Sequence, residues 1–297
     1  MLLLRLLLAL SLCATWLGSA RAEAPPRVGL AIIKTSQAAV SEALLVPGGR
    51  LGHKINSNFS AFLIKHQDDY LLFDTGMGRQ IDAQYALDMP WWWRPFFRYE
   101  RPVRSAREQL DAAGLAPPAR IILSHSHWDH AGGIGDFPEA RVGIAAAELP
   151  RIEQPTQGPG GSWASQLRAT PVHWESLSFE PRPYKGFAQS LDLYGDGSVV
   201  LVPMAGHTPG SIGLFVTTDA GHSYFLIGDV AWTLAALQQA RPKFWLASWL
   251  VDGDATQTQA SLERVRALMQ AEPQLVVVPA HDSAVQDALG YFPAWVR

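Results

Sequence analysis

Histidines gathered in one short stretch constrain this chain more than any other feature. Three of its nine histidines lie in residues 124–130, Ser-His-Ser-His-Trp-Asp-His, beside the carboxylate of Asp129. A short, mostly apolar run at residues 119–123 precedes the stretch and is typical of a buried strand. An Ala-Gly-Gly breaker follows at residues 131–133. The cluster is therefore predicted to lie at a strand end and to open a loop, where functional side chains are commonly placed.

The spacing within this cluster predicts metal binding. Side chains two apart in extended chain point the same way, so His125 and His127 can face one metal ion. Asp129 and His130 lie past the bend and can face a second ion. A single histidine is more often a satisfied core or surface residue. Several of them would repel one another when charged and would be costly to bury unpaired, which favours a metal site here.

Other chemistry-bearing residues also follow predicted strands. Asp74 follows an apolar run at residues 70–73 and opens Asp-Thr-Gly. The remaining candidates each follow a run that is typical of a strand: His207 in the glycine-rich loop 204–211, Asp229 after residues 223–227, and His281 after residues 275–278. Read alone, Asp74 could be a plain turn residue and His207 is ambiguous. His222 is expected to be a solvated turn residue.

The His-x-His-x-Asp-His pattern of residues 125–130 resembles the signature of the metallo-β-lactamase fold superfamily. The Asp-Thr-Gly at residues 74–76, the Gly-His-Thr-x-Gly-Ser at 206–211, the Gly-Asp at 228–229 and the Pro-Ala-His at 279–281 are similar to its further motifs. The resemblance implies a site in which the ligands divide as follows: His125, His127 and His207 on one metal, Asp129, His130 and His281 on the other, with Asp229 bridging and Asp74 supporting the ligands through hydrogen bonds.

The same resemblance implies the fold and the cofactor. The fold class is α/β (α+β), a four-layer αβ/βα sandwich of two mixed sheets flanked by helices. The expected strands are residues 28–33, 59–65, 70–73, 119–123, 140–144, 188–194, 199–202, 212–217, 223–227 and 275–278, and the expected helices are 105–113, 145–153, 256–270 and 283–289. A variable loop over the site is expected between residues 154 and 186. Two divalent metal ions are expected, with Zn²⁺ first and Fe, Mn or Co as alternatives, because imidazole and carboxylate suit them all.

The chemistry implied by the resemblance is metal-dependent hydrolysis. A water bridging two cations becomes hydroxide near neutral pH and attacks a carbonyl or phosphoryl centre. Asp229 and Asp129 are the expected catalytic residues, with Asp129 able to pass a proton to the leaving group. Residues 62–65 and 71–77 look most like the lactonase and organophosphate hydrolase branch. Its acyl-homoserine lactonases carry a Tyr at the position of Trp232, so a more generic ester, lactone or phosphotriester hydrolase is expected.

Other members of the fold are alternatives. A class B β-lactamase lacks the bridging Asp, so Asp229 counts against it, and a glyoxalase II-like thioesterase usually works in the cytosol. An iron-dependent oxidoreductase such as a sulfur dioxygenase shares much of the ligand set. A flavodiiron protein has Glu where this chain has His127. A non-catalytic, metal-stabilised binding protein is the alternative from another class, and the full ligand set argues against it.

Aromatic residues predict the substrate pocket. Residues 89–99 hold Trp91, Trp92, Trp93, Phe96, Phe97 and Tyr99. Trp91, Trp92, Trp93, Phe96, Trp232 and Trp245 are expected to line an apolar pocket for a small substrate with an apolar part. A buried helix or a homodimer contact explains the run equally well. A membrane-surface role is weaker, because the run is not a regular amphipathic helix.

The N-terminus predicts export. Residues 1–22 contain an early Arg, a leucine-rich core and an Ala-Arg-Ala end, typical of a signal peptide cleaved after about Ala22. The apolar core is short for a membrane span, so a periplasmic or secreted protein without a stable span is expected. Cys13, the only cysteine, would leave with the signal, and loss of Arg5 and Arg21 would change the formal net charge from −3 to −5. An acidic chain without a basic run argues against a nucleic-acid partner. Residues 23–297 are expected to form a single domain.

Overall fold

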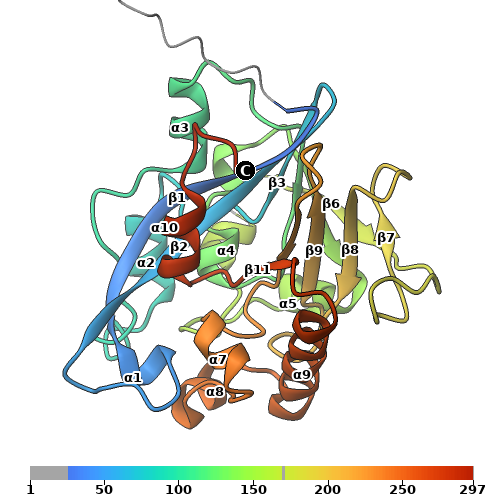
Figure 1. Ribbon diagram of the computed structural model, residues 1–297. Helices are drawn as coiled ribbons and strands as arrows, with labels where there is room; N and C mark the ends of the chain where they lie inside the picture. Colours follow the sequence, from blue (N-terminus) through green and yellow to red (C-terminus); the bar gives the residue numbers. More distant parts are fainter. Residues whose placement is uncertain (1–25, 169–170, 297) are drawn as a thin grey trace, which may run out of the picture.

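The computed structural model describes residues 26–168 and 171–296, and the strands of these residues form two mixed sheets (Figure 1). The first sheet has the order β1-β2-β3-β4-β5-β6. Its strands are β1 (Val28–Ser41), β2 (Lys54–His66), β3 (Asp69–Phe73), β4 (Arg120–Ile122), β5 (Arg141–Ala145) and β6 (His173–Leu177). The β1–β2 and β2–β3 pairs are antiparallel, whereas β3 to β6 run parallel to one another.

The second sheet has the order β11-β10-β9-β8-β7. Its strands are β7 (Leu191–Asp192), β8 (Val199–Pro203), β9 (Ile212–Thr217), β10 (Ser223–Leu226) and β11 (Val276–Val278). Strands β7 to β10 pair antiparallel, and β11 pairs parallel to β10.

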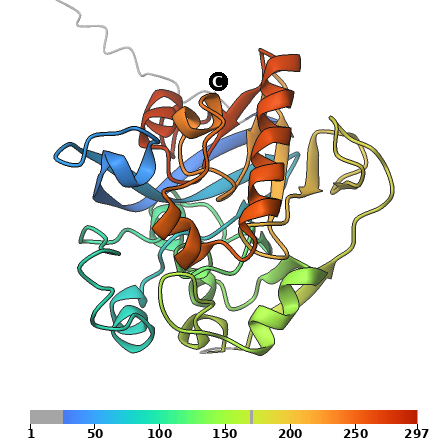
Figure 2. The same cartoon turned by 90° about the horizontal axis from the view of Figure 1, so that it is seen from below.

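The helices lie around these sheets and within the connecting loops. They are α1 (Glu42–Leu45), α2 (Ile81–Asp88), α3 (Ala106–Ala112), α4 (Trp128–Ala131), α5 (Leu149–Glu153), α6 (Ala164–Leu167), α7 (Leu234–Gln238), α8 (Trp245–Val251), α9 (Ala255–Ala271) and α10 (Ser283–Leu289). Helix α9 lies along the second sheet, as Figures 1 and 2 both show. No helix of the described residues is long and apolar enough to cross a membrane.

Side-chain alternation along the strands builds the layers. Leu30 and Ile32 of β1 face a core shared with the second sheet, whereas Ala31 and Ile33 face a second core that includes Leu110 of α3. The second sheet divides in the same way, because alternate residues of β8, β9 and β10 join the central core and the others pack against α7 and α9. The result is the predicted four-layer sandwich of two mixed sheets with helices outside.

Several elements differ from their expected bounds. Strand β1 continues to Ser41 across an irregularity between Lys34 and Ser36, and β2 begins at Lys54, so this antiparallel pair is much longer than expected. The expected strand at 188–194 shrinks to β7, because Asp192 turns its carboxylate back onto the N–H groups of the glycine turn that follows. The expected helix at 145–153 starts as a 3₁₀ turn and becomes α-helical only at Leu149, just before Pro150. The region expected to be a loop over the site contributes α6 and β6 instead.

The predicted signal peptide, residues 1–22, lies outside the described residues.

Candidate metal centre

The predicted metal ligands all lie in the segments that follow strands. Residues 125–130 follow β4 of the first sheet, and Asp74 follows the neighbouring strand β3. His207, Asp229 and His281 follow β8, β10 and β11 of the second sheet. A backbone hydrogen bond from Ile212 N to Ser124 O, 2.9 Å long, ties the two groups of loops together. The fold thereby brings residues more than 150 positions apart into one site.

A buried glutamate also joins these loops. The Glu148 carboxylate accepts hydrogen bonds from the backbone N–H of Ser126 at 3.1 Å and of Gly210 at 2.9 Å. It also accepts from the Ser126 hydroxyl at 2.6 Å. Glu148 therefore holds the loop that carries His127 against the loop that carries His207. The sequence analysis missed it, because nothing in the sequence marks one glutamate of residues 145–153 as buried.

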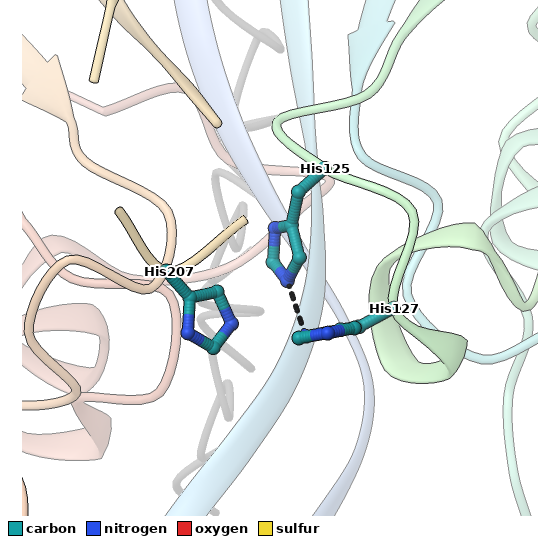
Figure 3. Close-up of side chains that lie close together, drawn as sticks. All are labelled: His125, His127 and His207. Atoms are coloured by element: carbon teal, nitrogen blue, oxygen red, sulfur yellow. Dashed lines mark hydrogen bonds between the residues drawn. The ribbon is translucent and has the colours of Figure 1, made fainter. Parts of the chain in front are cut away.

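His125, His127 and His207 form the first group of candidate ligands (Figure 3). All three side chains are buried, and each offers a ligand atom within 4.8 Å of the others. His125 Nε2 lies 3.0 Å from His127 Nδ1, and the ring centroid of His207 lies 4.7 Å from that of His125 and 4.6 Å from that of His127. Three imidazoles that converge in this way match the donor set of a tetrahedral metal site.

Asp129, His130 and His281 form the second group, and Asp229 lies between the two groups. One oxygen of Asp229, Oδ2, lies 3.2 Å from His281 Nε2 and 3.5 Å from His207 Nε2. Its other oxygen, Oδ1, lies 3.2 Å from His130 Nε2. The carboxylate of Asp229 therefore reaches ligands of both groups.

Four of the histidines hold one ring nitrogen in a hydrogen bond and turn the other toward the centre. The Nδ1 atoms of His130, His207 and His281 lie 2.7–2.8 Å from oxygens that can only accept: Asp74 Oδ2, Asp252 Oδ1 and the carbonyl oxygen of Asn58. Nδ1 must therefore donate, so in the neutral form of each ring Nε2 carries the lone pair that can bind a cation. His125 Nδ1 lies 3.0 Å from Ser124 Oγ, which itself donates to Asp74, so Ser124 accepts from His125. This pattern of outer hydrogen bonds is typical of metal-binding histidines.

Asp252 was missed by the sequence analysis. It is buried at the end of α8, and its Oδ1 atom accepts from His207 and from the Nζ atom of Lys243, both at 2.7 Å. Burial opposes ionisation of this group, but the His207 hydrogen bond and the Lys243 charge outweigh it and lower the pKa of Asp252 to about 2. The carboxylate is therefore ionised and aligned to orient His207. The available signal in the sequence was that Asp252 follows an apolar run. That pattern does not show which histidine Asp252 contacts.

The histidines of the first group are neutral near pH 7. Burial lowers the pKa of His125 and His127 well below that of an ordinary histidine, and neighbouring imidazoles lower it further. Burial and the nearby Lys243 ammonium also lower the pKa of His207. A neutral imidazole is the form that binds a metal ion, so no proton has to leave these rings first.

The donor set fits two divalent cations. His130 Nε2, His207 Nε2 and Asp229 Oδ1 are buried atoms without a hydrogen-bond partner in the described part of the chain. Leaving such atoms unsatisfied is costly, and they all face the centre between the two groups. Metal ions at the two groups would satisfy them.

An apolar cavity of about 320 Å³ opens onto these ligands. Its lining includes His127, Asp129, His207, Asp229 and His281. The remaining lining is mostly apolar. It comes from β1, α1, β2, residues 93–98, the loop after β10 and α8 with the residue before it, chiefly Ala38, Val40, Leu44, Leu45, Phe59, Trp93, Phe96, Phe97, Trp232, Phe244, Leu246 and Leu250. A cavity with a few polar groups at one end and apolar walls is the usual form of a small-molecule site.

The predicted pocket aromatics divide into two sets. Trp93, Phe96 and Trp232 line the cavity. Trp91, Trp92 and Trp245 do not line it, and all three are exposed, so the expectation is corrected for them. The helical period explains the case of Trp245: Leu246, Ala247, Leu250 and Val251 of α8 face the cavity, which turns Trp245 and Trp249 away from it. The alternative of a buried helix across the aromatic run is not seen either, because residues 91–96 form turns.

Trp232 contacts the centre through its indole N–H. Trp232 Nε1 donates to Asp229 Oδ2 at 2.9 Å, and its ring packs edge-on against His281 with centroids 6.2 Å apart. The ammonium of Lys243 lies 5.5 Å from the centroid of the same ring. Trp232 therefore combines a cavity wall with a hydrogen bond to the carboxylate that lies between the two ligand groups.

Comparison with known proteins identifies the family in which this arrangement occurs. The family model described as Metallo-beta-lactamase superfamily matches residues 59–281, which include Asp74 and every candidate ligand. A probable metallo-hydrolase of Mycobacterium tuberculosis is 32% identical over 237 residues, covering 74% of this chain and 73% of the relative. The N-acyl homoserine lactonase AttM of Azorhizobium caulinodans is 28% identical over 243 residues, covering 78% of this chain and 86% of the relative.

Solved structures show the same fold. An N-acyl homoserine lactone hydrolase with the product N-hexanoyl-L-homoserine at its catalytic metal centre superposes with a TM-score of 0.72 at 18% identity. The match covers 92% of this chain and all of the other. AidC, a dizinc quorum-quenching lactonase, gives a TM-score of 0.58 at 18% identity, covering 91% and 94% of the two chains.

Proposed function

The chain belongs to the metallo-beta-lactamase superfamily of metal-dependent hydrolases, and we propose that it holds two divalent cations, most readily Zn²⁺, and hydrolyses a small ester or lactone that carries an apolar group. We also propose that it acts outside the cytoplasm, on the strength of the signal-like residues 1–22.

The observation that carries this proposal is the position of the ligand set at one end of an apolar cavity. Asp129, Asp229 and the candidate histidines lie where a substrate in the cavity would meet them. The walls, formed by residues such as Phe59, Trp93 and Phe97, offer few polar partners. An ester or lactone with an acyl or aryl group satisfies both ends of this cavity.

When bound, two divalent cations supply Lewis-acid activation of a carbonyl and lower the pKa of a water molecule. Asp229 reaches both ligand groups and fixes their separation. Asp129 lies at the cavity surface with 12% of its side chain exposed, within reach of a bound leaving group, so it is the residue placed to carry a proton there. Trp232 offers no phenol beside the substrate, and its N–H is already committed to Asp229. The AttM relatives are lactonases of N-acyl homoserine, and this chain is proposed to act on a wider set of esters and lactones.

The experiment that tests this function pairs metal content with turnover. The purified protein is assayed for bound metal and for hydrolysis of an aryl ester, a γ-lactone with an alkyl chain, an N-acyl homoserine lactone, a phosphotriester and a cephalosporin. About two zinc-like ions per chain, with ester or lactone hydrolysis lost on chelation and restored by Zn²⁺, is the expected result.

Two other results would contradict the proposal. Turnover of the cephalosporin or the phosphotriester alone would assign a different substrate class to the same site. One iron per chain and no hydrolysis of the panel would point to oxidoreductase chemistry.

A further inference from the structure

Large aromatic and aliphatic side chains are exposed in the two segments that also supply lining residues to the cavity. They come from two segments far apart in sequence, and we call them the apolar rim: Trp91, Trp92, Phe96, Phe244, Trp245, Leu246 and Trp249. Phe96 of the first segment and Phe244 and Leu246 of the second are both exposed and part of the cavity lining. The two segments therefore meet at the mouth of the cavity.

These side chains are unusually exposed for their type. Trp91 is 74% exposed, Phe96 68%, Trp245 71% and Trp249 74%. Trp245 and Trp249 lie four positions apart and so share the outward side of α8, while Leu250 of the same helix lines the cavity. The helix is thus apolar on the side that faces solvent as well as on the side that faces the cavity. Exposed apolar patches around a site commonly mark a surface that binds something.

The two segments that carry the apolar rim contain basic residues and no acidic ones, although Asp88, Glu100 and Asp252 flank them directly. Residues 89–99 and 241–251 contain no Asp or Glu, although the whole chain has a formal net charge of −3. Arg98 and Arg241 are exposed, and neither forms an ion pair with a carboxylate of the described residues. Arg98 also contributes to the cavity lining, so at least one of these cations lies at the mouth itself.

We propose that the apolar rim binds the surface of an anionic lipid bilayer. Tryptophan concentrates at membrane interfaces, where its ring is partly buried and its N–H stays hydrated. Arginine beside it meets lipid phosphates, which anionic bilayers supply at high density. A second copy of this chain is the alternative occupant of the rim, and the test below distinguishes it from a bilayer.

Binding of the apolar rim to a bilayer would orient the mouth of the cavity. With the rim on a bilayer, the mouth between Phe96 and Phe244 would open toward the lipid, so an amphiphilic substrate could enter without crossing water. This consequence rests on the proposed function, whereas binding to the bilayer does not and is measured without turnover.

The test is sedimentation of the full chain with vesicles. Vesicles of phosphatidylcholine and phosphatidylglycerol at 3:1 are compared with vesicles of pure phosphatidylcholine. Each comparison is made at low salt and at about 0.5 M salt. The parent should sediment with the anionic vesicles, and its tryptophan emission should shift to the blue. A variant with Trp91→Ser, Trp92→Ser, Trp245→Ser and Trp249→Ser should bind at least about tenfold more weakly. Both proteins share residues 1–25, so the difference between them reports the rim alone.

Charge variants provide a matched control. Arg98→Gln with Arg241→Gln should weaken binding to anionic vesicles by about fivefold per arginine. Arg141→Gln with Arg182→Gln removes the same charge from exposed positions outside the rim and should leave binding unchanged. Equal binding of the parent and the four-tryptophan variant would overturn the proposal. The proposal would also be overturned if the parent did not bind vesicles but formed a dimer that the tryptophan variant cannot form. The rim would then be a contact between two copies of the chain.

Discussion

At the scale of single residues, the candidate ligands are oriented by side chains that do not themselves face the centre. Asp74 accepts three hydrogen bonds: Ser124 N on Oδ1 at 2.7 Å, and the Ser124 hydroxyl and His130 Nδ1 on Oδ2, both at 2.8 Å. Through them it sets the ring orientation of His130 directly and that of His125 through Ser124. Its backbone has a φ of +59°, a conformation that only Gly, Asn and Asp adopt readily.

Asp74→Asn tests the hydrogen bonds of this carboxylate separately from its backbone conformation. Asparagine keeps the backbone conformation but has one accepting oxygen, so it cannot serve donors on both of its terminal atoms. We expect the metal dissociation constant to rise by about 10- to 100-fold, with a parallel loss of turnover. Competition with a chromophoric chelator measures this directly. Asp111→Asn, on the exposed side of α3, is the matched control and should bind metal like the parent.

Trp232 allows a second test at this scale. Trp232→Phe keeps an aromatic cavity wall but removes the N–H that Asp229 accepts at 2.9 Å. A hydrogen bond to a charged group contributes about 1.5–3 kcal/mol, so we expect kcat/KM to fall by at least about tenfold. Trp93→Phe makes the same change in the same cavity, and Trp93 donates no side-chain hydrogen bond within the described residues. Equal losses in both variants would show that Trp232 acts only through its bulk.

At the scale of elements, the loop that carries His207 is seated on the start of α9. Gly206 has a φ of +141°, and a Cβ there would lie 2.3 Å from the backbone nitrogen of Thr258. The loop is also tied down by hydrogen bonds from Asp254 N to Gly206 O at 2.9 Å and from Gly253 N to His207 O at 2.8 Å. The position of His207 therefore depends on close contact between two backbones.

Gly206→Ala should push this loop away from α9. We expect loss of the first-group metal, seen as about half the metal content per folded chain, together with a destabilisation of about 1–3 kcal/mol in thermal unfolding. Gly221→Ala is the control: its φ is +80°, but a Cβ there meets nothing within 4 Å. It should show a similar backbone cost without loss of metal. If both variants kept full metal content, the seating on α9 would not position His207.

Local patterns predicted the parts of the structure that depend on strand alternation and strand ends. The division of Leu30 and Ile32 from Ala31 and Ile33 follows from strand geometry once β1 is recognised, although all four residues are apolar and the sequence shows no alternation there. The position of residues 125–130 at a strand end could be predicted, because an apolar run precedes them and an Ala-Gly-Gly breaker follows. The rotation of α8 could not, because both of its sides are apolar and its sequence contains no contrast that fixes which side is buried. Trp245 was therefore placed in the cavity when Leu246 lines it, and Asp252 was overlooked because its partner His207 lies 45 positions away.

At the scale of the whole molecule, each ligand group joins the two sheets. His125 and His127 come from the first sheet and meet His207 from the second. Asp129 and His130 come from the first sheet and meet His281 from the second. Metal ions bound there would link the halves of the sandwich. Without them, buried imidazoles and carboxylates would be left facing one another at the junction.

Chelation should therefore lower the melting temperature as well as abolish activity. A cation present at about 1,000 times its dissociation constant stabilises the folded state by about 4 kcal/mol. For a protein of this size that corresponds to a shift of roughly 10 °C. The measurement is thermal unfolding with and without a chelator, followed by readdition of Zn²⁺, which should restore the original temperature. A variant with His125→Ala, His127→Ala and Asp129→Ala lacks ligands of both groups, so a chelator should leave its melting temperature unchanged. A parent that loses its metal and melts at the same temperature would show that the hydrogen bonds between the loops, such as Ile212 N to Ser124 O, hold the two sheets together without the cations.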